Sequence, residues 1–198
     1  MLALVTFPLA TYCLFLAFLN GRRRPTVLAG NVDLMFLAVG LSGLFLAGPG
    51  RLLIPLNVLT FWGDIAWLLW AAFYLIVVQT VVWKLRRRIV IYNFPIAEMV
   101  PKLWEVVRNL DASAEWVGNS MTLPKYGIQF YFEVAPGSRN VVLVATRTSQ
   151  SVASWQNLEM DIELSFRTIH VRRGPTAFFF FIAAVSLGGI GGWAISYG

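Results

Sequence analysis

Residues that carry metal and covalent chemistry are scarce in this chain of 198 residues, which has one cysteine and one histidine. Cys13 lies inside an apolar run and has no second cysteine with which to form an internal disulfide. One cysteine and one histidine are too few ligands for a zinc cluster. The single histidine, His170, cannot supply both ligands of a bis-histidine haem. We therefore expect no metal site and no resident cofactor.

Catalytic and nucleotide-binding motifs are missing as well. The sequence has no P-loop, no GxGxxG and no HExxH. Residues 40–43 read GLSG and resemble the GxSG nucleophile motif of rhomboid intramembrane proteases. That family needs a histidine at the depth of its serine, whereas His170 lies at the predicted cytoplasmic boundary, and helix packing explains these glycines better. We predict no catalytic residue and no enzyme activity.

Charged residues are also few, at 13% of the chain, while apolar residues make up 58% and the mean hydropathy is +0.67. This balance predicts an α-helical integral membrane protein. The first apolar segment has no basic residue before it and no cleavage pattern after it, so we expect an uncleaved helix. Four segments are long enough for a hydrocarbon core of about 30 Å: Leu2 to Leu19, Val27 to Ala47, Val58 to Trp83 and Thr176 to Tyr197.

The excess of positive charge, +6 in total, lies mainly beside these segments. Basic clusters at 22–24, 84–88 and 172–173 mark cytoplasmic ends by the positive-inside rule. Both termini are then outside and the stretch 89–170 is cytoplasmic, in what we expect to be a bacterial cytoplasmic membrane. The predicted membrane-interface residues are Arg22, Arg23, Arg24, Arg86, Arg87 and Arg88, with Trp62 and Trp83, whose separation of 21 positions equals about 31 Å of helix.

The polar stretch 89–170 has six basic and eight acidic residues, a net charge of −2. That sign opposes binding to a phosphate backbone, so no nucleic-acid partner is expected. The lipid bilayer and other membrane-protein subunits are the partners that the sequence predicts.

Small residues predict two helix-packing faces. The face in segment two holds Gly40, Gly43 and Ala47, and the ridge in segment four holds Ala184, Gly188, Gly192 and Ser196 at intervals of four. Such a ridge needs a partner helix, which is either segment two or a helix of another protein.

Two carboxylates in apolar segments, Asp33 and Asp64, are the candidate functional acids. Asp33 lies near the cytoplasmic end of segment two and Asp64 near the outer tryptophan, so they are expected close to opposite membrane faces. An interfacial carboxylate that meets water or a helix end is the commoner fate of such a residue. Nearby aromatic residues leave a lipid, pigment or quinone contact open, although packing is more usual: Trp67, Trp70, Phe73 and Tyr74.

The stretch 89–170 predicts a small α+β domain of order β-α-β-β-β-α inserted between the third and fourth membrane helices. Alternation at Ile128 to Val134 indicates a strand, and apolar residues recur at helical intervals from Ile96 to Leu110. A second amphipathic helix follows a cap at Ser149 or Ser151. This order resembles the topology of double-stranded RNA-binding domains. Residues 150–154, which read QSVAS, lack the basic cluster with which that family begins its last helix.

The sequence therefore predicts three regions: a three-helix transmembrane region at 1–88, the cytoplasmic domain at 89–170 and a last transmembrane helix at 171–198. Strong packing signals without catalytic groups favour a non-catalytic accessory subunit of a larger membrane complex. Two alternatives stay open. One is a small proton or solute transporter that uses Asp64 or Asp33, and the other is a membrane sensor that binds a ligand or peptide at the sheet face carrying Gln129, Tyr131 and Glu133.

Overall fold

A computed structural model of the chain describes residues 2–48, 61–134, 139–147 and 150–197. The chain divides into two compact units. The helical unit consists of Met1–Ala17, Leu34–Lys84 and Phe178–Gly198. The sheet unit consists of Phe18–Asp33 and Leu85–Ala177, so it contains the predicted domain at 89–170 and adds a segment from before the second membrane helix.

Four long helices confirm the prediction of a multi-pass membrane protein at the level of length and composition. Each has 18 or more residues, and their most apolar windows have mean hydropathies of 1.6 to 2.2, enough to cross a membrane. Their bounds are α1 Leu2–Gly21, α2 Gly30–Ala47, α5 Asp64–Lys84 and α8 Thr176–Tyr197. The first residues of the predicted third segment, 58–60, lie outside the described residues.

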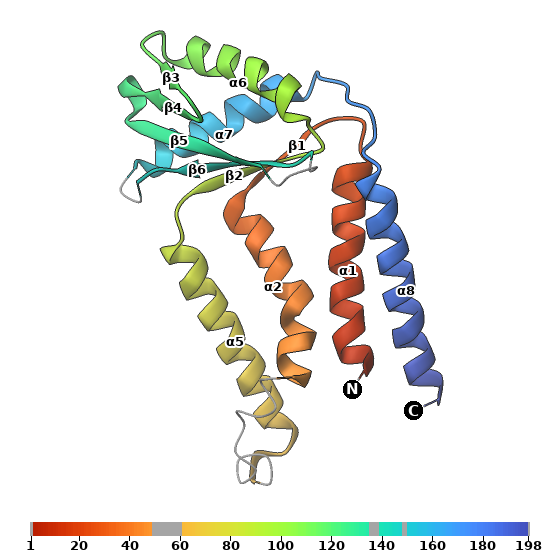
Figure 1. Cartoon of the computed structure of the whole chain (residues 1–198). Coiled ribbons are helices and arrows are strands. Elements are labelled where there is room, and N and C mark those ends of the chain that lie inside the picture. Colours follow the sequence, from red (N-terminus) through yellow and green to blue (C-terminus); the bar gives the residue numbers. More distant parts are fainter. Residues whose placement is uncertain (1, 49–60, 135–138, 148–149, 198) are drawn as a thin grey trace. The chain divides into compact units, whose positions relative to one another are not determined.

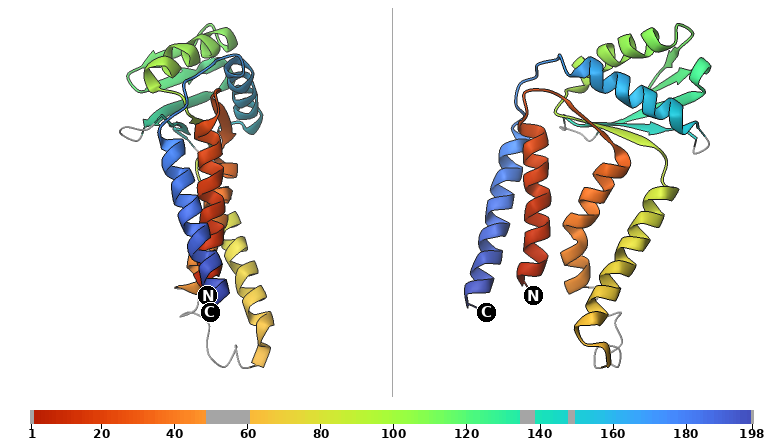
Figure 2. Two further views of the ribbon diagram at one scale, coloured as in Figure 1. Left: turned by 90° about the vertical axis from the view of Figure 1, so that its right-hand side faces the viewer. Right: turned by 180° about the vertical axis from the view of Figure 1, so that it is seen from behind.

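Within the helical unit these helices follow one another in the order α8, α1, α2, α5 (Figure 1; Figure 2). The stretch Ile65–Lys84 of α5 is the most exposed, with 6% of its most apolar window buried inside the protein. The hydroxyl group of Tyr74 on α5 donates a hydrogen bond of 2.7 Å to the carbonyl oxygen of Ala38 on α2. Phe45 stacks on Tyr74 across the same contact, with ring centroids 4.8 Å apart.

The sheet unit is built on one sheet of six strands, all paired antiparallel. The strand order is β1-β2-β6-β5-β4-β3. The strands are β1 Thr26–Ala29, β2 Arg88–Tyr92, β3 Glu115–Val117, β4 Ser120–Leu123, β5 Ile128–Val134 and β6 Val141–Ala145.

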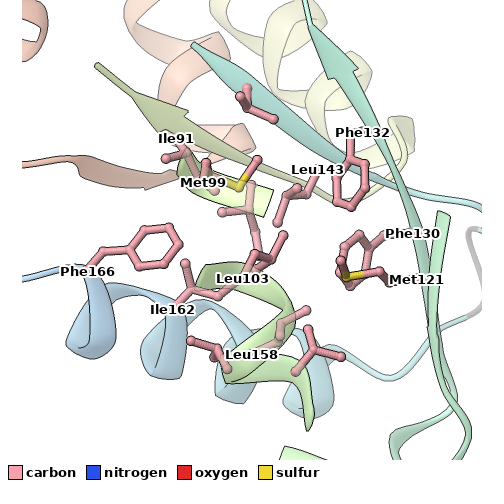
Figure 3. Packing of buried hydrophobic residues seen from close by; sticks show 14 of the residues in the cluster. Ile91, Met99, Leu103, Met121, Phe130, Phe132, Leu143, Leu158, Ile162 and Phe166 are labelled. Carbon is pink, nitrogen blue, oxygen red and sulfur yellow. The ribbon is translucent and has the colours of Figure 1, made fainter. Parts of the chain in front are cut away.

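Helices α6 (Ile96–Leu110) and α7 (Val152–Phe166) cover one face of this sheet. Ser151 caps α7, and its hydroxyl oxygen accepts a hydrogen bond of 3.3 Å from the backbone N–H of Ser154. Every second side chain of β2, β5 and β6 points toward the helices, and in β5 this matches the alternation of the sequence from Ile128 to Val134. The core between the layers includes Ile91, Met99, Leu103, Met121, Phe130, Phe132, Leu143, Leu158, Ile162 and Phe166 (Figure 3).

One strand was not predicted. Residues Thr26–Ala29 form β1 and pair with β2, whereas the predicted second membrane segment begins at Val27 and so includes three of them; the helix begins instead at Gly30. An apolar run of four residues has the same composition in a buried strand as in a helix, so hydropathy does not separate the two. The sheet unit is therefore not a simple insertion between the third and fourth membrane helices, because β1 comes from before α2.

A second difference concerns residues 115–123, where the predicted order β-α-β-β-β-α allows for a single strand after the first helix. In the structure these residues form the hairpin of β3 and β4. Gly118 lies in the turn with a φ of +58°, a conformation that glycine adopts without strain. The order of the predicted domain is thus β-α-β-β-β-β-α, with β1 added at the edge.

Candidate functional site

Asp33, one of the two candidate acids, lies in the first turn of α2 and belongs to the sheet unit. Its carboxylate accepts a hydrogen bond from the hydroxyl group of Tyr92, the last residue of β2. Tyr92 is buried and faces Thr26 of β1 across the sheet. This bond ties the start of α2 to β2, the strand next to the edge strand β1. No local sequence pattern reveals the partnership, because 59 positions separate the two residues.

Asp64, the other candidate acid, is the first residue of α5. Its side chain lies outside the part of the chain that the structure describes. A carboxylate at a helix N-terminus is favoured by the helix dipole. Its role as an interfacial carboxylate or a functional acid stays a prediction.

An open groove of about 470 Å³ runs beside the Asp33 carboxylate in the sheet unit. It lies on the sheet face opposite α6 and α7, because Val90 and Val142 alternate with residues of the helix-covered core. The predicted ligand face contributes Glu133 of β5, whose carboxylate accepts a hydrogen bond of 3.1 Å from the hydroxyl group of Tyr131. The groove is lined by Asp33, Val90, Tyr92, Glu133, Val134, Asn140 and Val142.

The chemistry of the groove follows from its two carboxylates. Asp33 and Glu133 stand among aliphatic, tyrosine and asparagine side chains, and the described lining holds no basic residue. Such a surface attracts cations and hydrogen-bond donors rather than anions. Among the described residues no group of three or more His, Cys, Asp or Glu side chains comes together as a metal site.

The small-residue face of segment two packs on α1. A Cβ atom on Gly43 would lie 2.0 Å from the carbonyl oxygen of Leu4, and one on Gly40 would lie 2.6 Å from the Cβ of Tyr12. These contacts let the two backbones approach closely, as small residues do in membrane helices. Ala47 is the last residue of α2 and is half-buried.

On α8 the contact with α1 uses a glycine that the sequence did not single out. Ala184 is buried, and a Cβ atom on Gly191 would lie 2.5 Å from the Oγ1 of Thr6 on α1. Seven residues separate Ala184 from Gly191, two full turns, so the pair shares one side of the helix. Of the predicted ridge at intervals of four, only Ala184 takes part in this contact.

The rest of that ridge stays open. A Cβ atom on Gly188 or on Gly192 would meet no described atom within 4 Å. Ser196 is exposed, and its hydroxyl group donates a hydrogen bond of 3.1 Å to the carbonyl oxygen of Gly192 within the same helix. The structure thus offers these residues no partner among the described helices.

The predicted interface residues lie near the ends of α1 and α5, apart from Arg88 in β2, and their place at a membrane interface stays a prediction. Arg22, Arg23 and Arg24 follow α1 and are exposed, and Trp62 and Trp83, just before α5 and in its last turn, are exposed too. Arg86 is exposed between α5 and β2. Arg87 and Arg88 are half-buried at the start of β2, where the side chain of Arg88 crosses Gly30 so closely that a Cβ there would lie 1.9 Å from its Cγ.

The aromatic residues of α5 pack in part on their own chain. Trp70 stacks with Phe73 at a centroid distance of 5.2 Å and with Phe45 of α2 at 6.2 Å. Together with the hydrogen bond of Tyr74, these contacts hold α5 beside α2. Trp67 is half-buried.

Comparison of the chain with protein-family models, with curated protein sequences and with solved structures found no significant match. Function is therefore argued from the faces and the groove described above.

Proposed function

We propose that this protein is a non-catalytic subunit of a larger membrane-protein complex, in which α8 binds a helix of a neighbouring subunit. The observation that carries the proposal is the ridge of Gly188, Gly192 and Ser196, which no described helix contacts. It lies beside the small residues Ala184 and Gly191, which pack on α1. In a bilayer, lipid tails are as apolar as leucine, so helices associate through close backbone approach at small residues. Gly191 allows this close approach between α8 and α1, and the ridge is a second surface of α8 on which another helix could pack closely.

The order of the helices supports the same proposal. Because α8 and α5 stand at the two ends of the row in the helical unit (Figure 1), each has lateral surface that no helix of the described chain covers. A leucine-rich surface needs only lipid, but a glycine ridge exposes backbone polar groups that a partner helix covers better than acyl chains do.

The proposed topology follows from charge. The basic clusters at 22–24, 84–88 and 172–173 are assigned to the cytoplasmic side of a bacterial inner membrane, with both termini outside and the sheet unit in the cytoplasm. Cysteine labelling with an impermeant reagent tests this assignment. A cysteine introduced at exposed Gln156 should react only after the membrane is permeabilised. Reaction in intact cells would place the sheet unit outside and contradict the proposed topology.

The size of the complex in mild detergent tests the subunit proposal. The chain extracted from its native membrane should elute at a mass well above 22.2 kDa plus detergent, and Gly188→Leu with Gly192→Leu should convert it to monomer. Ala194→Leu is the control, because it adds bulk to α8 about 160° around the helix from Gly192 and so on the side away from the ridge. A monomeric wild-type protein, or equal behaviour of both variants, contradicts the proposal.

The groove supports a second candidate function, a sensor whose sheet unit binds a cationic ligand. Two acidic side chains, Asp33 and Glu133, border the groove, and its described lining lacks a compensating base. Polyamines and arginine-rich peptides should raise the melting temperature of the full chain, and Glu133→Gln should abolish the shift. Glu105→Gln on α6 is the control, and absence of a shift with both ligand types would remove this candidate.

A further inference from the structure

Two basic segments that are far apart in the sequence meet at one end of the sheet unit. The backbone N–H of Val171 donates a hydrogen bond of 2.9 Å to the carbonyl oxygen of Arg23, so the segment before α8 runs beside the segment after α1. Arg22 to Arg24 and Arg172 to Arg173 thereby share one region, and all five side chains are exposed. The whole region belongs to the sheet unit.

Asn93 joins a third basic segment to this region. It is fully buried and adopts a φ of +58°, which asparagine tolerates better than most residues. Its side-chain Nδ2 donates a hydrogen bond of 2.7 Å to the carbonyl oxygen of Arg22. The next residue, Phe94, donates its backbone N–H to the carbonyl oxygen of Arg139 at 2.7 Å. We call the six arginines Arg22, Arg23, Arg24, Arg139, Arg172 and Arg173 the arginine junction.

The positive charge of the arginine junction is not neutralised by described carboxylates. In the part of the chain that the structure describes, the ion pairs are Lys102 with Glu105 and Arg167 with Glu163, on α6 and at the end of α7. Arg22 lies over the ring of Phe18, 5.1 Å from its centroid, which leaves guanidinium N–H groups for another acceptor. The junction therefore attracts an anion.

Buried polar atoms without a described partner gather beside these arginines. A Cβ atom on Gly174 would lie 3.2 Å from the Oδ1 of Asn93, 3.3 Å from the Oγ1 of Thr176 and 3.4 Å from the Cδ of Arg139. Those two oxygens, and the Nε bonded to that Cδ, are buried and have no hydrogen-bond partner among the described residues. Unpaired polar atoms in such a place indicate a bound molecule that supplies the missing partners.

The position of Thr176 suits an anion in particular. It is the first residue of α8, a helix of 22 residues, where the helix dipole favours negative charge. A phosphate oxygen can accept hydrogen bonds from the Thr176 hydroxyl and from the Nε of Arg139, while a hydroxyl group or water donates to the Oδ1 of Asn93.

We propose that the arginine junction binds the phosphate of an anionic phospholipid headgroup. Lipid is favoured over soluble phosphate because α1 ends at Gly21 and α8 begins at Thr176, so two membrane helices reach the surface of the bilayer at this point. Arginines that only set topology need no buried polar atoms beside them. Arg139 and Thr176 therefore distinguish a binding site from a topology signal.

Isothermal titration calorimetry of the detergent-solubilised full chain tests the proposal. Dioctanoyl phosphatidylglycerol should bind with a Kd at least about tenfold lower than dioctanoyl phosphatidylcholine. Arg172→Gln and Arg173→Gln should each weaken phosphatidylglycerol binding about fivefold, since a basic residue near an anionic surface contributes roughly that factor. Thr176→Val should weaken it about tenfold through loss of a hydrogen bond to a charged group.

The matched control is Arg147→Gln, which removes the same charge from an exposed position outside the junction. It should leave the Kd unchanged, and an equal loss in this variant would overturn the proposal by showing general charge attraction. Equal affinity for the two lipids would overturn it as well. So would inorganic phosphate that displaces phosphatidylglycerol at similar concentration, because the site would then take the free ion. Arg172 and Arg173 are exposed, so their variants test binding even if Arg139→Gln unfolds the sheet unit.

Discussion

The hydroxyl group of Tyr92 donates a hydrogen bond to the carboxylate of Asp33, and this contact joins the last residue of β2 to the first turn of α2. It explains why an acid can stand near the start of an apolar helix: its charge is met by a buried donor from the sheet. Asp33 thus belongs structurally to the sheet unit, although its helix is long and apolar enough to span a membrane.

Removal of that hydroxyl group should destabilise the sheet unit. Tyr92→Phe is expected to lower the free energy of unfolding by about 1.5 kcal/mol, the lower end of the range for a hydrogen bond to a charged group. Thermal unfolding of the full chain in detergent measures the loss. Tyr131→Phe is the matched control, because its hydroxyl group bonds to Glu133 in an exposed place and its removal should change stability less. Equal losses in the two variants would show that the hydrogen bond to Asp33 contributes no more to stability than the exposed one to Glu133.

The contact between α1 and α2 should tolerate no side chain at Gly43. In Gly43→Ala the new Cβ would lie 2.0 Å from the carbonyl oxygen of Leu4, so the helices must separate, at about 1 to 3 kcal/mol. In Gly21→Ala, the new Cβ would lie 3.7 Å from the Cβ of Ala177, an ordinary van der Waals contact. Melting of the chain in detergent should fall in the first variant and stay unchanged in the second. Two equally stable variants would contradict the described α1–α2 packing.

Acid should weaken the sheet unit through Asp111. Its carboxylate accepts hydrogen bonds from the Ser113 hydroxyl at 2.5 Å and from the backbone N–H of Lys125 at 2.8 Å. The Ser113 hydroxyl, and then the backbone N–H groups, hold the pKa of Asp111 below its ordinary value. Because the folded-state pKa is the lower one, the stabilisation is complete above the unfolded value of about 3.9 and is lost as pH falls through the folded value.

Asp111→Asn should therefore lower the melting temperature at pH 7, and the difference from wild type should shrink as the pH falls below about 3.9. Unfolding of the full chain followed by circular dichroism over this pH range makes the comparison. Asp161→Asn on α7 controls for the general effect of removing one negative charge. A difference that persists unchanged at the lowest pH would show that the Asp111 contribution is not electrostatic.

The sequence predicted those helices and strands whose signal lies in residues close together in the chain. The membrane helices follow from long apolar runs, and β5 follows from the alternation of Ile128, Phe130 and Phe132 with polar neighbours. Strand β1 was not predicted because its residues run into an apolar segment and its pairing with β2 connects residues 60 to 66 positions apart.

The candidate site was harder to predict for the same reason. Asp33 and the face of Glu133 were each recognised from the sequence, but the groove that brings them together exists only after β1, β2, β6 and β5 assemble. Asn93 gave no signal, since its role rests on contacts with the distant segments of Arg22 and Asn140. On α8, the interval of four identified small residues without showing that Gly191 faces α1.

The central claim is that the open ridge of α8 binds a neighbouring subunit, and site-specific photo-cross-linking in the native membrane tests it most directly. A photoreactive residue at Gly192 should give a protein adduct of defined mass, while the same residue at exposed Ile190, on the opposite side of the helix, should give none. The two positions are two residues apart on α8, about 3 Å in depth and about 160° around the helix, so the two samples differ mainly in helix face. Lipid adducts alone from both positions, or the same protein adduct from both, would contradict the account.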